Sequence, residues 1–170
     1  DVCSSDLTDQ PKDRVSFVGQ QVKFDFGVSG KPPLTFQWLR NGVAITGATS
    51  ATYVTDPLLA TDDRAKYSVR VTNAQGSVTS SEATLTVKPG STITGQPSAV
   101  TINAGAAATF FVTATGEQLQ YQWLRDDQPI AGANAATYTL TAAAAADDGA
   151  LFTALVVNPG GVVASQTVAL

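Results

Sequence analysis

The chain has 170 residues, a net charge of −4 and a pI near 4.5, and 44% of its residues are hydrophobic while 14% are charged. This composition is typical of a globular protein, and the acidic balance argues against nucleic-acid binding, which needs a basic surface. No apolar run reaches the roughly 18 residues of a membrane-spanning helix, so no membrane insertion is expected. Because histidine is absent, catalysis by an imidazole and metal ligation by an imidazole are both excluded. We expect neither a cofactor nor enzymatic activity.

The first residues read DVCSSDL and include Cys3, which is the only cysteine in the sequence. Residues 1–6 match the translation of the end of a widely used sequencing adapter. We therefore interpret residues 1–6 as adapter sequence that precedes the first domain. On this interpretation Cys3 has no role as a nucleophile, a disulfide partner or a lipid attachment site.

The remainder of the chain is an internal repeat with a period of about 85 residues. The segment LTFQWLRNGVAITGATSATYVT at 34–55 returns as LQYQWLRDDQPIAGANAATYTL at 119–140. A unit of this length is too long for a solenoid repeat and suits one small sandwich domain. The repeat predicts two similar domains in tandem.

Each repeat contains short segments in which apolar residues alternate with polar ones, which is typical of half-buried strands. In repeat one these segments are QVKFDFGV at 21–28, LTFQWLR at 34–40 and AKYSVRVTN at 65–73, and turn sequences such as NAQG at 73–76 separate them. The alanine-rich segment TAAAAADD at 141–148 favours a helix. Only about one turn fits there, so we expect a short helical crossover in an otherwise all-β fold.

These features resemble the immunoglobulin superfamily, and in particular the Ig-like repeats of bacterial surface and secreted proteins. The resemblance rests on a third-strand tryptophan and on a D-x-x-x-Y-x-C-x-x-x-N pattern in each repeat. The tryptophans are Trp38 and Trp123, and the pattern reads Asp63, Tyr67, Val69 and Asn73 in repeat one and Asp148, Phe152, Ala154 and Asn158 in repeat two. The resemblance implies two tandem immunoglobulin-like β-sandwiches.

Members of this family often join their two sheets with a disulfide, and here apolar residues take the two cysteine positions. Phe26 and Val69 take them in repeat one, and Val112 and Ala154 take them in repeat two. The second pair is smaller, and Phe152 lacks the hydroxyl with which Tyr67 would form a tyrosine-corner hydrogen bond. We therefore expect repeat two to be the less stable repeat.

The alignment predicts the domain boundaries. Domain 1 covers residues 7–88, a linker rich in Pro and Gly covers 89–92, and domain 2 covers 93–170. Val87 has no counterpart in repeat two, so we expect a truncated last strand and a chain that is a fragment of a longer array.

Two sets of residues are candidates for binding. The acidic pairs Asp62–Asp63 and Asp147–Asp148 are weak candidates for Ca²⁺ ligands, and the alternative is that they cap the turn before the sixth strand. Phe17 and Phe111 stand where the other repeat has Asn103 and Asp25, and they are candidates for exposed apolar contacts. The alternative is that neighbouring strand side chains cover them.

Two functions agree with these observations. The first is a non-catalytic extracellular module that acts as a spacer or adhesion element of a larger surface or secreted protein, in contact with neighbouring Ig-like repeats and with an unknown protein or glycan ligand. The second is a pair of ancillary domains, carbohydrate-binding ones among them, of a secreted enzyme. Extracellular or cell-surface location follows from the family resemblance alone.

Overall fold

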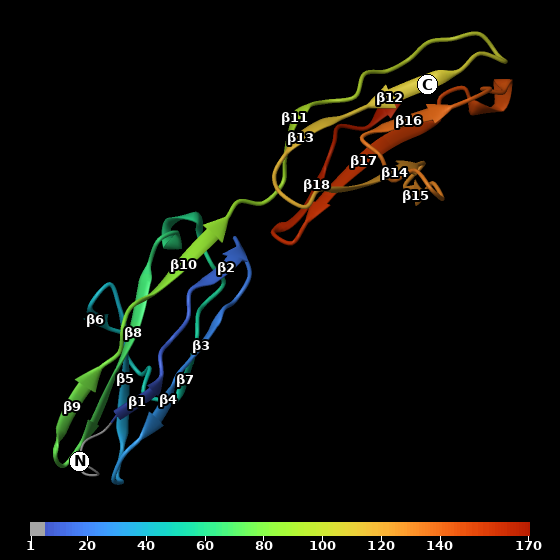
Figure 1. The fold of residues 1–170 in the computed structure, drawn as a ribbon. Coiled ribbons are helices and arrows are strands. Elements are labelled where there is room, and N and C mark those ends of the chain that lie inside the picture. Colours follow the sequence, from blue (N-terminus) through green and yellow to red (C-terminus); the bar gives the residue numbers. More distant parts are fainter. Residues whose placement is uncertain (1–5) are drawn as a thin grey trace. The chain divides into compact units, whose positions relative to one another are not determined.

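The computed structural model describes residues 6–170, which form two compact units that divide between Lys88 and Pro89 (Figure 1). The interpretation of the adapter segment and of Cys3 lies outside the described residues, except for Asp6, which begins the first strand. Within residues 6–170, no helix is long and apolar enough to cross a membrane.

The first unit is a sandwich of short strands. One side holds β1 paired with β4 and β3 paired with β7, and the other holds a sheet in the order β2-β10-β8-β5-β6, with β9 also paired to β8. The strands are β1 (Asp6–Asp9), β2 (Arg14–Phe17), β3 (Lys23–Asp25), β4 (Gly27–Ser29), β5 (Thr35–Arg40), β6 (Val43–Ala44), β7 (Thr52–Val54), β8 (Lys66–Asn73), β9 (Gly76–Thr79) and β10 (Ala83–Lys88).

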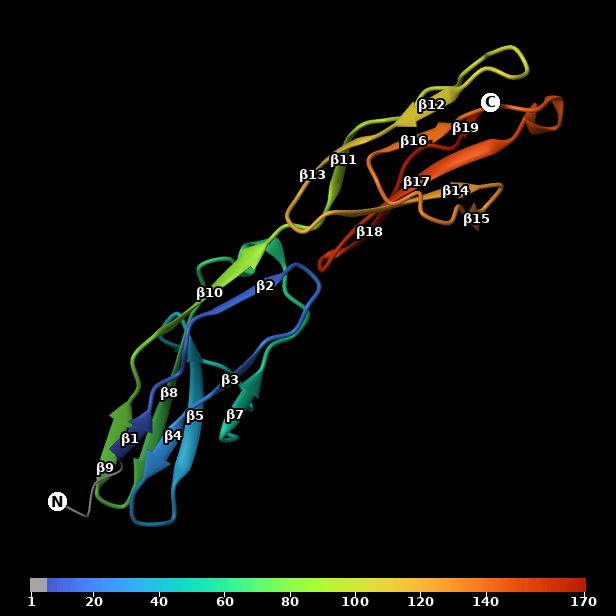
Figure 2. The same ribbon diagram turned by 45° about the vertical axis from the view of Figure 1, so that its right-hand side comes forward.

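The second unit repeats this plan. Strand β11 pairs with β13, β12 pairs with β16, and the opposite sheet runs β15-β14-β17-β18, with β19 also paired to β17. Figure 2 shows these two groups of strands as separate layers. The strands are β11 (Thr92–Gly95), β12 (Ala108–Phe111), β13 (Thr113–Thr115), β14 (Gln120–Arg125), β15 (Gln128–Pro129), β16 (Thr137–Leu140), β17 (Leu151–Asn158), β18 (Gly161–Ala164) and β19 (Val168–Ala169).

The predicted all-β fold of two tandem sandwiches is confirmed, and so is the short helical crossover. Each unit has a single 3₁₀ turn before its longest strand, η1 (Ala60–Asp62) in repeat one and η2 (Ala145–Asp147) in repeat two. The alanine run does not extend this helix, because Asp148 leaves helical geometry and β17 begins at Leu151.

The units differ along their last strand. In repeat one, β10 pairs with both the antiparallel β8 and the parallel β2, and the β2 pairing runs from Leu85–Arg14 to Lys88–Phe17. In repeat two, β19 pairs with β17, and residues 100–103 are outside any strand, although Val100 N donates a hydrogen bond to Ala169 O at 3.1 Å.

Candidate functional site

The two tryptophans of the repeated motif lie at the centre of each core. Trp38 and Trp123 are fully buried. Each indole Nε1 donates a hydrogen bond to a backbone carbonyl 12 residues later, to Ser50 and Ala135 respectively, at 3.0 Å. Burying an indole is favourable only when its N–H has a partner, so both rings have a structural role and neither is available for a ligand.

An aromatic pair packs beside each tryptophan. Phe24 stacks on Tyr67 with ring centroids 4.5 Å apart, and Phe110 stacks on Phe152 at 4.4 Å. The sequence analysis identified Tyr67 and Phe152 but did not assign Phe24 to the core signature. The signal was present, because Phe24 and Phe110 are the same residue type at equivalent positions of the two repeats. The tyrosine-corner hydrogen bond of Tyr67 stays a prediction.

The positions of the family disulfide are apolar and packed. Val69, Val112 and Ala154 are at most 1% exposed, whereas Phe26 is partly buried and packs edge-on against Trp38 at 5.7 Å. Phe26 with Val69 in repeat one, and Val112 with Ala154 in repeat two, therefore take the place of the covalent link by burial of apolar surface.

The acidic residues before the sixth strand are used within the fold. The Asp62 carboxylate accepts a hydrogen bond from Leu59 N at 2.8 Å and forms an ion pair with Arg40. In repeat two, Asp147 accepts one from Ala144 N at 2.7 Å and pairs with Arg125, also at 2.7 Å. The backbone hydrogen bond from Ala144 and then the Arg125 guanidinium lower the pKa of Asp147, so this carboxylate stays charged.

The second acid of each pair lies elsewhere. Asp63 Oδ1 accepts a hydrogen bond from Val87 N at 2.9 Å, while Asp148 lines a cavity. Among residues 6–170, no three His, Cys, Asp or Glu side chains gather as a metal site. Because Asp62 and Asp147 already accept hydrogen bonds and pair with arginines, the arrangement favours the turn-capping alternative over Ca²⁺ ligation.

The two phenylalanines proposed as exposed contacts have different environments. Phe111 is 56% exposed at the end of β12, whereas Phe17 is only 8% exposed. Of the two alternatives, the covered one therefore holds for Phe17 and the exposed one for Phe111. The cause is the parallel pairing of β2 with β10, in which Phe17 lies opposite Lys88, and a long-range parallel pair of this kind has no local sequence signal.

A buried serine holds the last strand of each repeat at a point where the strand pairing is interrupted. Ser80 Oγ accepts a hydrogen bond from Val69 N at 2.9 Å and donates one to Ser81 O at 2.8 Å. Ser165 does the same with Ala154 N and Gln166 O, also at 2.9 and 2.8 Å. Neither serine was predicted as a structural residue, although both stand at equivalent positions of the two repeats.

The solvent-facing side of the β14-β17-β18 sheet is a surface on which the two repeats differ in chemical character. Phe152, Ala154 and Val156 of β17 point inward and are fully buried, so the alternate residues point outward. We call the resulting surface the outer face of repeat two. It consists of the apolar residues Leu151, Leu155 and Val157 on β17, with Val162 and Ala164 opposite the last two on β18. Thr153 lies between Leu151 and Leu155 on the same face, and Gln120 and Gln122 of β14 lie opposite Val157 and Leu155 on the other side of β17.

Repeat one has polar side chains at these five positions. The equivalents in chain order are Lys66, Arg70, Thr72, Ser77 and Thr79. In repeat two, Leu151 is 46% exposed and Val162 is 61% exposed. Exposed apolar residues gathered on one face, rather than scattered singly, mark an interaction surface.

Comparison with known proteins agrees with this architecture. Residues 5–87 match the model of the immunoglobulin I-set domain. Among solved structures, the I67–I69 I-band fragment of titin is 15% identical to this chain with a TM-score of 0.65. Extracellular domains 3–5 of Drosophila OTK are 17% identical with a TM-score of 0.56. Both matches cover 98% of this chain. The chain spans 64% of the titin fragment and 61% of the OTK chain. Residues 5–87 are therefore similar to the immunoglobulin I-set domain, and both repeats share the sandwich fold of these structures.

Proposed function

We propose that this chain is a non-catalytic extracellular module of a larger surface or secreted protein, in which repeat one is a polar spacer and repeat two is an adhesive contact. The observation that carries the proposal is the outer face of repeat two. Five outward positions are apolar there and polar or charged in repeat one. Because both repeats share one fold, the fold does not require apolar residues at these positions.

The partner that we propose for the outer face is a second copy of the chain. Residues 91–170 hold Arg125 against five acidic residues, a net charge of −4, so two copies that meet through charged surfaces repel each other. The five residues of the outer face carry no charge. Strand β18 is also at the edge of the sheet, where it pairs with β17, and edge strands of two molecules can pair.

A bead-clustering assay tests this function. Beads that carry the 170-residue chain should cluster, and the triple variant Leu155→Arg, Val157→Thr, Val162→Ser should lower clustering at least tenfold, since each change installs the residue of repeat one. The reciprocal variant of repeat one, Arg70→Leu with Thr72→Val and Ser77→Val, is the matched control and should increase clustering. Absence of clustering by folded wild-type chain would refute homotypic adhesion.

The carbohydrate-binding alternative has less support. Among residues 6–170, Phe111 is the only aromatic side chain among the strongly exposed apolar ones, and Trp38 and Trp123 are buried. One phenyl ring offers a small platform for a sugar. Binding of the isolated chain on a glycan array, with loss on Phe111→Ala, would favour this alternative over homotypic adhesion.

A further inference from the structure

The side chains of the outer face lie in rows that cross three neighbouring strands. The first row contains Gln120 of β14, Val157 of β17 and Val162 of β18, because Val157 pairs with both of the others. The second row, in the same strand order, consists of Gln122, Leu155 and Ala164. From β18 the first row thus projects a valine that is 61% exposed, and the second row projects only an alanine methyl group.

The surface is hollowed at the β14 end of the first row. Two open cavities of about 460 and 280 Å³ lie there, and Gln120 and Val157 line both of them. The larger cavity also has Asn134 in its lining. This residue follows Ala133, whose carbonyl accepts a hydrogen bond from Trp123 N at 3.0 Å, so the cavity opens along the side of β14 that faces away from β17. None of the residues that line either cavity is charged.

The second row has a fixed side chain at the same end. Gln122 Nε2 donates hydrogen bonds to Trp123 O and to Ile130 O, both at 2.8 Å, so this amide is held against its own repeat. A projecting side chain on β18 and a hollow at β14 therefore occur together in the first row, at opposite ends, and the second row has no projecting side chain on β18.

Repeat one lacks the apolar side chains of the first row. Thr35, Thr72 and Ser77 stand at the positions of Gln120, Val157 and Val162. The Thr35 hydroxyl donates to Thr72 O at 3.2 Å. The same strand register thus carries short polar side chains in repeat one.

We propose that two copies of the chain meet through the outer face about a two-fold axis that runs along β17, with Val162 of each copy in the hollow beside Gln120 of the other. This inference rests on the proposed homotypic adhesion and specifies its geometry. A rotation about that axis exchanges the two sides of β17 and keeps the position along the strand, so the β18 end of each row lies over the β14 end of the same row in the second copy. The projecting valine then meets the hollow, and Ala164 meets the fixed Gln122.

Two other arrangements leave the hollow unfilled. A two-fold axis across the strands, and an edge-to-edge pairing of β18, both bring β18 of one copy against β18 of the other. The axis along β17 instead covers Val162 and fills the hollow with one and the same contact. Because the two rows and the lining of the hollow are uncharged, this contact removes no charged group from water.

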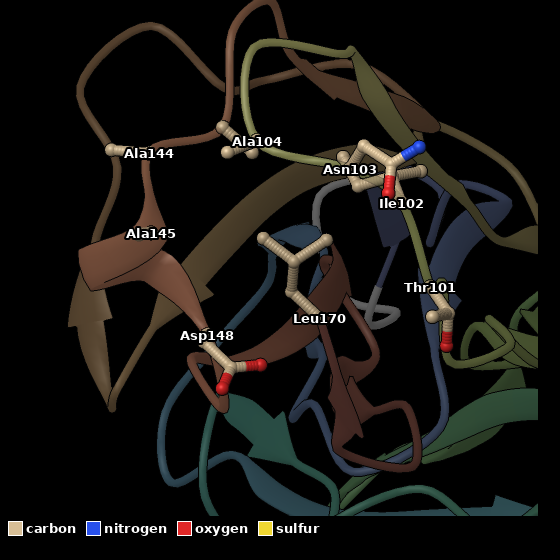
Figure 3. Close-up of a pocket in the computed structure, with 9 residues that line it drawn as sticks. Thr101, Ile102, Asn103, Ala104, Ala144, Ala145, Asp148 and Leu170 are labelled. Carbon is tan, nitrogen blue, oxygen red and sulfur yellow. The ribbon is translucent and has the colours of Figure 1, made fainter.

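Disulfide trapping in a Cys3→Ser background tests the arrangement. Chains with Gln120→Cys or Val162→Cys are prepared separately, and the mixture of the two should form disulfide-linked dimers at least tenfold faster than either variant alone. Thr101→Cys is the matched control, because Thr101 is exposed and lines a separate cavity beside Leu170 (Figure 3), whose lining shares no residue with the hollow. This control should not link to either variant above background.

The outcomes separate this geometry from the adhesive function. Bead clustering by the parent chain without preferential linkage between Gln120→Cys and Val162→Cys would overturn the arrangement and leave homotypic adhesion standing. Faster linkage of Val162→Cys to itself than in the mixture would overturn it as well, and would indicate that β18 meets β18. Absence of both clustering and linkage would refute the adhesive function itself.

Discussion

Replacing Ser80 with alanine tests whether one hydroxyl bridges the interruption in the last strand of repeat one. The residue is 9% exposed, and its side chain links Val69 N to Ser81 O. Its backbone N–H also donates to Val69 O at 2.9 Å, and this bond remains in the variant. Ser80→Ala therefore removes two side-chain hydrogen bonds and leaves the Val69 N–H buried without its acceptor.

The size of the effect follows from these losses. A buried donor without a partner costs about 1–3 kcal/mol, and a single net hydrogen bond contributes about 0.5–1.5 kcal/mol. We expect the free energy of unfolding of repeat one to fall by about 2–3 kcal/mol. For a domain of this size that corresponds to a decrease in Tm of roughly 8–24 °C.

Calorimetry of the full chain, with hydrogen exchange to assign each transition to its repeat, measures the effect. Ser77→Ala on the exposed strand β9 is the matched control, and we expect it to change the free energy by less than about 0.5 kcal/mol. Ser165→Ala should destabilise repeat two to a similar extent, since its geometry is the same. A loss below about 0.5 kcal/mol for Ser80→Ala would refute the reasoning and would indicate that water replaces the hydroxyl.

Three further outcomes follow from the structure. Because hydrogen bonding lowers the folded-state pKa of Asp147, this carboxylate stabilises repeat two above its unfolded pKa, and the stabilisation is lost as the pH falls through the folded pKa. In Asp147→Asn, the urea midpoint of repeat two should therefore depend less on pH in the acid range. An unchanged pH dependence of the midpoint would contradict this role. Gly160→Ala would place its Cβ 2.8 Å from Gly90 Cα, so we expect the free energy of unfolding of repeat two to fall by about 1–3 kcal/mol. The NMR chemical shifts of residues 89–91 should also change, and unaltered shifts would argue against this contact. Repeat two should unfold before repeat one in calorimetry, and a reversed order would refute the comparison of their cores.

The features that the sequence predicted are those with a local or repeated signal. Alternation and turn residues identified the strands, and the doubled tryptophan motif identified the two sandwiches. The burial of Phe17 depends on a parallel partner about 70 residues away, which alternation does not reveal. The ion pairs of Asp62 with Arg40 and of Asp147 with Arg125 were not predicted, although the motif WLR recurs, because each joins a loop to a strand about 22 residues away in the sequence.

Comparison of the two repeats separates residues that the fold requires from residues with other roles. The tryptophans, the arginine–aspartate pairs and the bridging serines are the same in both repeats, and all of them satisfy buried or strand-end groups. The outer face changes from polar to apolar while the strand register stays the same. A change that the fold does not need, at five positions on one face, is the observation that points to a function.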